Sequence, residues 1–121
     1  MRSYPLLLLV INLSICLVPA PFAGAQQSLE TIEDIQKIGL SASHPLNGHY
    51  VLTHDIDASA TASWVGGNGF APIGDEATPF TGIFDGQGYE IRGLVINRIL
   101  IDNVGFFGVV GDDGLIKNLG L

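Results

Sequence analysis

The sequence is poor in cysteine and in positive charge, and both shortages narrow what the chain can be. It has 1 cysteine in 121 residues, Cys16, which excludes a domain stapled by internal disulfide bonds. Lys and Arg number 5 against 12 Asp and Glu, so the formal net charge is −7. Such a surface repels DNA, RNA and anionic lipid. We therefore expect no nucleic-acid partner, and a fold held by packing and backbone hydrogen bonds.

Recognisable catalytic motifs are also missing. The sequence holds no G-x-S-x-G, H-E-x-x-H or G-x-x-x-x-G-K-[ST] pattern, so nucleophilic, zinc-protease and nucleotide chemistry lack support. His44, His49 and His54 recur every five residues, which matches neither a helix face nor a strand face. We interpret them as surface or turn histidines. The sequence predicts no catalytic residue, no cofactor and no metal site.

No apolar run reaches the roughly 20 residues of a membrane span. A nearly apolar stretch, Leu6 to Val18, follows the positive charge of Arg2 and precedes Ala23-Gly-Ala25, the small-x-small pattern that signal peptidase reads. We predict a signal peptide over residues 1–25, cleaved before Gln26; a retained anchor is the alternative. Cleavage would also remove Cys16. The mature protein is then expected to be secreted or held at the cell surface, without membrane insertion.

Residues 26–45 form the first predicted unit, a capping helix followed by a turn. Between Gln26 and Gly39, large aliphatic residues recur every three positions, which places them along one side of a short helix. Ser28 or Thr31 can serve as the N-cap. We predict that the helix covers an open apolar end of the next unit; a solvent-exposed helix is the alternative. The aliphatic residues are Leu29, Ile32, Ile35 and Ile38.

Glycine is abundant, with 16 residues, and it punctuates a sequence echo at a step of 25. Ile91 to Ile96 returns as Ile116 to Leu121, and Gly86 returns as Gly111. A period in the twenties is the length of one coil of a solenoid, whose coils bury their apolar faces by stacking. Residues 46–121 are thus predicted to form an incomplete β-helix. An antiparallel sandwich is the alternative.

An inserted loop is predicted at residues 59–74. The segment that starts at Gly48 aligns with the segment that starts at Gly88 at a step of 40, which is one coil of 25 plus 15 residues. The loop carries Trp64 and Phe70. An exposed Trp64 can stack on a sugar ring, whereas the interpretation that we favour is that both aromatic residues fold back onto the coil.

Acidic residues supply the remaining chemical candidates. Asp55 and Asp57 share one face of a strand and can hold calcium, but a solvated strand end is the favoured interpretation because the further oxygen ligands cannot be assigned. Asp112-Asp113 is interpreted as a turn. Asp85-Gly-Gln-Gly88 is a turn pattern also found in polysaccharide lyases and galacturonases. Those enzymes need paired carboxylates or a cationic cluster as well, and the sequence shows neither.

The order of five segments resembles the opening of bacterial GLUG-motif proteins, which are exported and related to filamentous-haemagglutinin-type adhesins. The resemblance covers nearly all of the mature chain. It implies a right-handed parallel β-helix that works as an adhesin or a surface structural protein. The GLUG-type repeat begins here but stops inside its first unit. The segments are Gly48–Asp57, Phe70–Gly74, Pro79–Gly88, Val104–Gly108 and Ile116–Leu121.

We therefore expect an all-β fold, a right-handed single-stranded parallel β-helix with a short N-terminal capping helix. The expected function is that of a non-enzymatic, exported, adhesin-like surface module, the N-terminal fragment of a longer repeat protein. Two alternatives are a fragment of a polysaccharide lyase or glycoside hydrolase on the same fold, and a truncated product without function. Cell-surface or carbohydrate ligands are the expected partners.

The end of the sequence predicts an open apolar surface. Ile116, Leu119 and Leu121 are expected to stack on the residues that the echo aligns with them, and no following coil covers their other side. We therefore predict end-to-end self-association or fraying at this end. The aligned residues are Ile91, Leu94 and Ile96.

Overall fold

The computed structural model describes residues 26–99 and 101–121. The predicted signal peptide therefore lies outside the described residues. No helix in the described ranges is long and apolar enough to cross a membrane. The elements in chain order are β1 (Gln26–Leu29), α2 (Ile32–Gln36), β2 (His49–Leu52), β3 (Ile56–Asp57), the 3-10 helix η2 (Ser59–Gly67), β4 (Ile83–Asp85), β5 (Ile91–Arg92) and β6 (Leu115–Lys117).

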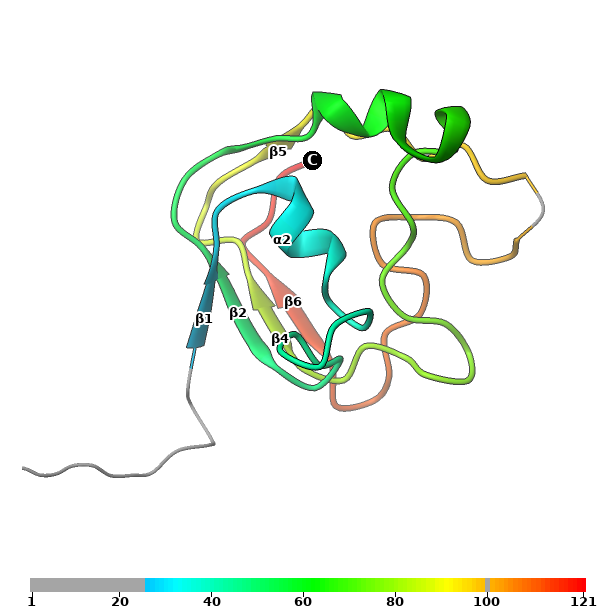
Figure 1. Cartoon of the computed structure of the whole chain (residues 1–121). Helices are drawn as coiled ribbons and strands as arrows, with labels where there is room; N and C mark the ends of the chain where they lie inside the picture. Colours follow the sequence, from blue (N-terminus) through cyan, green and yellow to red (C-terminus); the bar gives the residue numbers. More distant parts are fainter. Residues whose placement is uncertain (1–25, 100) are drawn as a thin grey trace, which may run out of the picture.

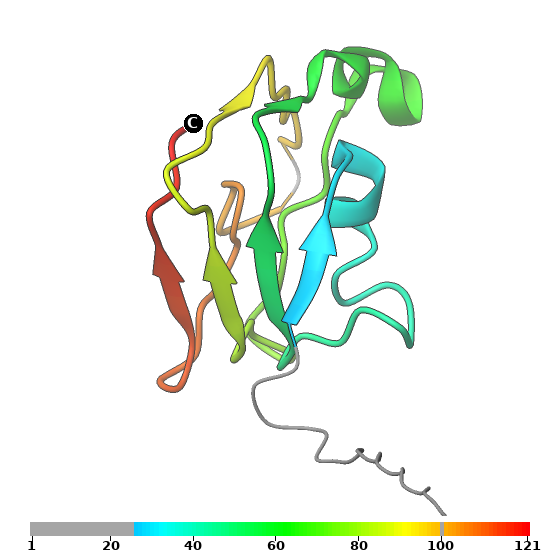
Figure 2. The same ribbon diagram turned by 90° about the vertical axis from the view of Figure 1, so that its left-hand side faces the viewer.

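Parallel pairing organises the strands into two small sheets (Figures 1 and 2). The larger sheet has four strands in the order β1-β2-β4-β6, and the smaller one joins β3 to β5. Isolated parallel bridges join Ile73 to Phe107 and Phe80 to Val110. Since every pair of named strands is parallel, the antiparallel sandwich is excluded.

The predicted all-β, right-handed single-stranded parallel β-helix is wrong. The described chain forms two small parallel sheets together with α2 and η2, and its strands are only two to four residues long. Turns, bends, isolated bridges and irregular backbone make up the rest of the described chain. Glycines at positive φ, such as Gly74 (83°) and Gly93 (76°), explain part of this interruption, because strand backbone requires negative φ.

The 25-residue echo does not set the strand register. Ile116 lies opposite Phe84, 32 residues earlier, and not on Ile91 as predicted. Ile91 lies opposite Ile56, at a step of 35 rather than 40. The 25-residue repeat does not predict the strand pairing, because backbone hydrogen bonds set which residues of β4 and β6 lie opposite each other. The amide of Leu115, for example, donates to the Gly82 carbonyl at 2.9 Å. The predicted stacking of the last apolar residues on those of one coil earlier is therefore also wrong.

The N-terminal unit contains a shorter helix than predicted, although its buried side is confirmed. Residues 26–29 pair as β1 with β2, and α2 begins only at Ile32. Thr31 is the N-cap, since its Oγ1 accepts a hydrogen bond from the Asp34 amide at 3.1 Å. Strand pairing overrides helix periodicity over the first four residues. The residues predicted to be buried, Leu29, Ile32, Ile35 and Ile38, are all at most 2% exposed.

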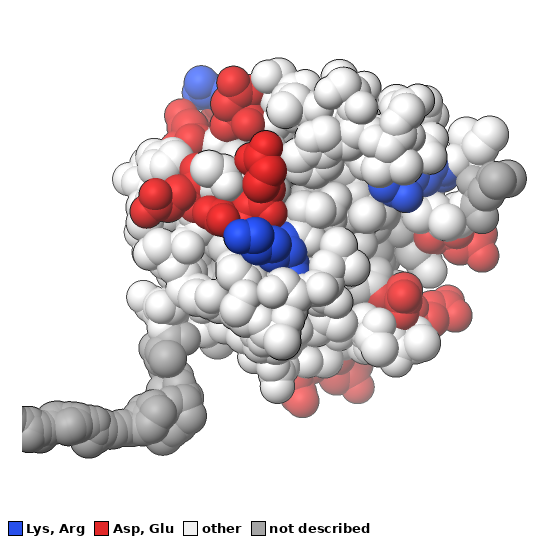
Figure 3. Space-filling view, in the orientation of Figure 1, with Lys and Arg blue, Asp and Glu red and all other residues white. Residues whose placement is uncertain are grey.

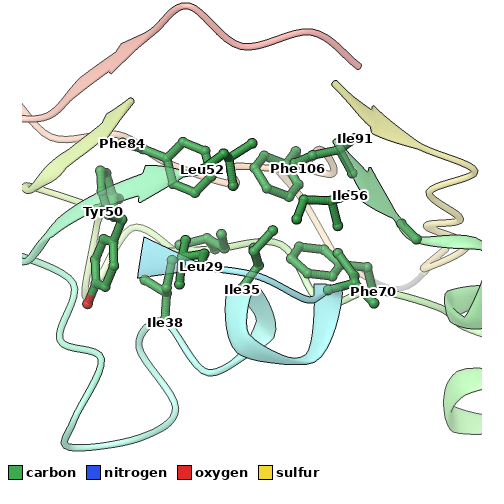
Figure 4. Close-up of a cluster of buried hydrophobic side chains, with 14 residues drawn as sticks. Leu29, Ile35, Ile38, Tyr50, Leu52, Ile56, Phe70, Phe84, Ile91 and Phe106 are labelled. Atoms are coloured by element: carbon green, nitrogen blue, oxygen red, sulfur yellow. The ribbon is translucent and has the colours of Figure 1, made fainter. Parts of the chain in front are cut away.

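The core lies between the four-stranded sheet, α2 and the segments that carry Phe70 and Phe106 (Figure 4). The rings of Phe70 and Phe106 stack at 5.2 Å between centroids, and Phe84 meets Phe106 edge-on at 5.7 Å. Aromatic pairs of this kind stabilise a core beyond the area that they bury. α2 packs beside β1, so it closes the core at the β1 end of the sheet (Figure 2).

Candidate functional site

The described surface has a pocket of about 270 Å³. It lies between the turn after α2, the segment 71–78, Arg98 and the segment 101–103. Aliphatic side chains and charged groups both face it, which is the usual make-up of a small-ligand site. Its lining residues include Gln36, Leu46, Asp75, Arg98, Ile101 and Asp102.

Arg98 is held on the pocket wall by backbone carbonyls. Its Nε donates to the Phe70 carbonyl at 3.2 Å, and its Nη2 donates to the Gly69 carbonyl at 3.0 Å. The guanidinium has five N–H donors, so more than half of them remain for other partners. Within residues 26–99 and 101–121, Arg98 forms no ion pair. The pocket thus offers a guanidinium that is held in place and can donate further hydrogen bonds.

Asp75 and Asp102 bring carboxylates to the same pocket. Asp75 Oδ1 accepts hydrogen bonds from the Thr78 amide at 2.8 Å and the Thr78 hydroxyl at 3.0 Å. The bond from the backbone amide is the main cause that lowers the pKa of Asp75, so this side chain stays ionised. The pocket therefore combines donors from Arg98 with carboxylate acceptors, next to the aliphatic walls of Leu46 and Ile101.

Gln36 joins α2 to the segment that follows η2, and forms part of the pocket. Its Nε2 donates to the Ala71 carbonyl at 3.0 Å, and its Oε1 accepts from the Ala71 amide at 2.8 Å. Sequence reasoning missed Gln36 and the pocket residues Asp75, Arg98 and Asp102. No local pattern signals them, because 35 residues separate Gln36 from its partner.

The predicted aspartate pair does not point to one centre. Asp55 Oδ1 accepts from the Glu90 amide at 2.9 Å, and its other oxygen pairs with Arg92 at 3.4 Å. Asp57 Oδ1 accepts from the Ser59 amide at 2.9 Å, which lowers its pKa. The described residues hold no cluster of three or more His, Cys, Asp or Glu side chains arranged for a metal ion. Asp57 therefore accepts a local hydrogen bond, whereas Asp55 joins the start of β3 to the residues at β5.

The three histidines take separate roles and do not converge. His44 lies in the turn that follows α2, where it is buried and stacks on Tyr50 at 6.0 Å. His49 contacts the Gln26 side chain at 3.3 Å, and His54 contacts the Asp55 carbonyl. Burial raises the pKa of Tyr50 to about 12, and its hydroxyl donates to a backbone carbonyl.

Both acidic turns are present. Asp85 Oδ1 accepts from the Gln87 amide at 2.9 Å and from the Asn118 side chain at 3.1 Å, so the pKa of Asp85 is lowered. Asp112-Asp113 forms the turn that was predicted, closed by a 2.9 Å bond from the Gly114 amide to the Gly111 carbonyl.

The aromatic residues of the predicted inserted loop fold back onto the protein. Phe70 is fully buried, and Trp64 is half-buried against the core. The segment is not wholly irregular, because Ser59–Gly67 contains 3-10 helical turns, which non-helical backbone at Trp64, Val65 and Gly66 interrupts. Thr61 anchors it: its hydroxyl donates to the Ala58 carbonyl at 2.6 Å and accepts from the Val95 amide at 2.9 Å.

Two known proteins are similar to this chain. It is 47% identical over 95 residues to Halomucin of Haloquadratum walsbyi, a match that covers 75% of this chain and 1% of Halomucin. It is also 47% identical over 73 residues to a protein described as a Gly-rich membrane protein of Evansella cellulosilytica, covering 60% of this chain and 8% of that protein. Neither name mentions GLUG motifs or haemagglutinin-type adhesins. No family model matches the chain, and no solved structure matches it significantly.

Proposed function

We propose that the protein is an exported module associated with the cell surface, and that it binds a ligand without catalysing a reaction. The match to Halomucin carries the proposal: 95 residues at 47% identity correspond to 1% of that protein. A compact unit that matches a small part of a far longer chain is typical of a binding or structural module. The name of the second relative, a Gly-rich membrane protein, supports the location.

Three aspartates have hydrogen bonds and pKa shifts that suit a structural role rather than a catalytic one. Asp57, Asp75 and Asp85 each accept a backbone amide bond, and each has a lowered pKa. A general acid in glycoside hydrolysis needs a raised pKa, which burial in an apolar pocket would supply. These three side chains stabilise turns instead. The alternative of a lyase or hydrolase fragment therefore gains no support from them.

The pocket at Arg98 suits a small uncharged polar ligand, and a sugar unit is the class we propose. Hydroxyl groups can accept from the guanidinium and donate to Asp102, while Leu46 and Ile101 contact the apolar face of the ring. The resemblance to GLUG-motif proteins supports the finer hypothesis of an adhesin-like module that recognises a cell-surface glycan.

Localisation is tested by fractionating cells that produce the protein and by treating intact cells with protease. The proposal expects the protein on the outer surface or in the medium, degraded by external protease when it is cell-bound. Retention in the cytoplasm in an intact form would contradict it.

Ligand binding is tested on an array of bacterial and plant glycans, combined with a reducing-end assay on the same polysaccharides. The proposal expects binding without the release of reducing ends. Asp102→Ala removes an acceptor in the pocket and should weaken binding about fivefold or more. Asp112→Ala is the matched control, since it removes a carboxylate from a distant turn. Release of new reducing ends would instead favour the enzyme alternative.

A further inference from the structure

A second, smaller hollow adjoins the pocket. It has a volume of about 140 Å³, and its described lining residues are Asn68, Arg98, Ile99 and Ile101. Arg98 and Ile101 line the pocket as well, so the two hollows share a wall. We call the smaller one the Asn68 hollow. A ligand of two or more sugar units can therefore lie across both.

The two hollows differ in charge. Asp75 and Asp102 line the pocket, whereas the described residues that line the Asn68 hollow include no acid. An anionic group in the pocket would lie near two carboxylates, which is unfavourable. In the Asn68 hollow the same group would meet the Arg98 guanidinium and the Asn68 side-chain amide, which are both hydrogen-bond donors. The pocket thus favours a neutral unit, and the Asn68 hollow favours an acidic group.

The guanidinium of Arg98 keeps one edge for a ligand. Its Nε and Nη2, which lie along one edge of the planar group, donate to the carbonyls of Phe70 and Gly69. The end formed by Nη1 and Nη2 has no acidic partner among the described residues. Two N–H groups side by side at such an end fit two oxygens of one acidic group, a geometry that lysine does not provide. The two carbonyl bonds hold this end in place before a ligand arrives, which lowers the cost of ordering it.

Arg98 differs from the other cations of the described chain. Lys37 and Arg92 each pair with an acid, and Lys117 lines neither hollow. Figure 3 shows Lys and Arg side chains that lie apart from one another, so the described residues form no cationic cluster on the face in view. Arg98 therefore combines a fixed direction, an available edge and an adjoining hollow.

We infer that the Asn68 hollow binds an acidic substituent of a sugar chain, a group with at least two anionic oxygens such as the carboxylate of a uronic acid or a sulfate ester. The inference rests on the proposed function, because a neutral unit of the same chain occupies the pocket. Two oxygens of the acidic group accept from the Nη1–Nη2 end of Arg98, and the Asn68 amide donates a further bond. Ile99 and Ile101 contact the rest of the acidic unit. The protein therefore prefers an acidic glycan to its neutral counterpart.

Matched glycan probes test this preference. Each set holds a neutral oligosaccharide, the same chain with C6 of its terminal unit oxidised to a carboxylate, and the same chain sulfated at that position. The parents are chains of glucose, galactose, mannose or N-acetylglucosamine, and calorimetry at physiological ionic strength gives the dissociation constants. In at least one set an acidic member should bind about three- to tenfold more tightly than its parent. The carboxylate and sulfate members show which acidic group the hollow prefers.

Asn68→Asp tests where the acidic group binds. The side chain is exposed, and an unchanged thermal midpoint would show that the fold is intact. A carboxylate at this position repels the acidic substituent, so the ratio of acidic to neutral affinity should fall to about one or below. Asn47→Asp is the matched control, because Asn47 is also exposed, also precedes a glycine and lines neither hollow. It should keep the wild-type ratio.

Three results would overturn the inference. The first is equal binding of acidic and neutral members in every set that binds, which would leave the proposed function standing. The second is a preference for acidic members that Asn68→Asp and Asn47→Asp change equally, since the acidic group would then bind elsewhere. The third is the absence of binding to every acidic probe, in which case the glycan array decides separately whether the proposed function stands.

Discussion

Single carboxylates in this protein stabilise turns. Asp57 and Asp85 each accept the amide two residues later, and Asp75 accepts the amide three residues later. Such contacts favour the ionised side chain, which is why the pKa of each is lowered. The acidic composition of the chain is thus partly structural.

The lowered pKa of Asp85 makes the stability of the folded protein depend on pH. Because the pKa of Asp85 is lower in the folded chain than its ordinary value of 3.8, the folded form favours the ionised carboxylate. The contribution is complete above pH 3.8 and is lost as pH falls through the folded pKa. Asp85→Asn should therefore flatten the fall in thermal midpoint between neutral and acid pH. Asp112→Asn, in an exposed turn, is the control; if both variants flatten the curve equally, the turn bond of Asp85 has no special effect.

Gly82 is a position where any side chain meets the neighbouring strand. A Cβ there would collide with the carbonyl of Gly48, which accepts the Ile83 amide at 2.9 Å. Gly82→Ala should lower the free energy of unfolding by about 1 to 3 kcal/mol, the usual cost of overpacking. Gly105→Ala is the comparison, because its added Cβ meets only the Phe107 carbonyl, at 3.1 Å. Chemical denaturation measures both, and equal stabilities would show that β2 and β4 can move apart at no cost.

At the scale of elements, α2 connects sequence and fold. The three-residue spacing of its aliphatic residues correctly predicted a buried side. It did not predict that Gln26–Leu29 is a strand. A buried Leu29 is compatible both with the inner side of a helix and with the inner face of β1. Only the pairing of β1 with β2 separates these possibilities. The two hydrogen bonds from Gln36 to Ala71 then fix α2 over the core.

Shortening one buried side chain of α2 tests whether this helix covers the core. Ile35 is fully buried, so Ile35→Ala should lower the free energy of unfolding by about 2 to 5 kcal/mol, from lost burial and the cavity that remains. Glu33→Ala, in the same turn and exposed, should change it by about 0.5 kcal/mol or less. Thermal and chemical denaturation measure both. Equal effects from the two variants would show that α2 does not close the core.

At the scale of the whole molecule, the predicted signal peptide would decide where the protein works. The Ala23-Gly-Ala25 pattern predicts that the mature chain begins at Gln26, the first residue of β1. Replacing Ala25 by a bulky residue such as Phe should block processing, because signal peptidase accepts only small side chains there. N-terminal sequencing of the exported protein checks the cleavage site. Met1 at its N-terminus would contradict the prediction, and Gln27→Phe serves as a control beyond the cleavage site.

The sequence by itself determined local features: which aliphatic residues are buried in the N-terminal unit, where the Asp85 and Asp112 turns lie, and that a disulfide framework is excluded. Each of these depends on spacing or composition within a few residues. The resemblance to a β-helix family and the 25-residue echo did not predict the fold, since apolar residues match at several steps and only hydrogen bonds select one register. Tertiary structure alone placed Phe84 beside Ile116 and brought Arg98 to the pocket. These outcomes join residues about 30 positions apart, a distance over which local preference carries no information.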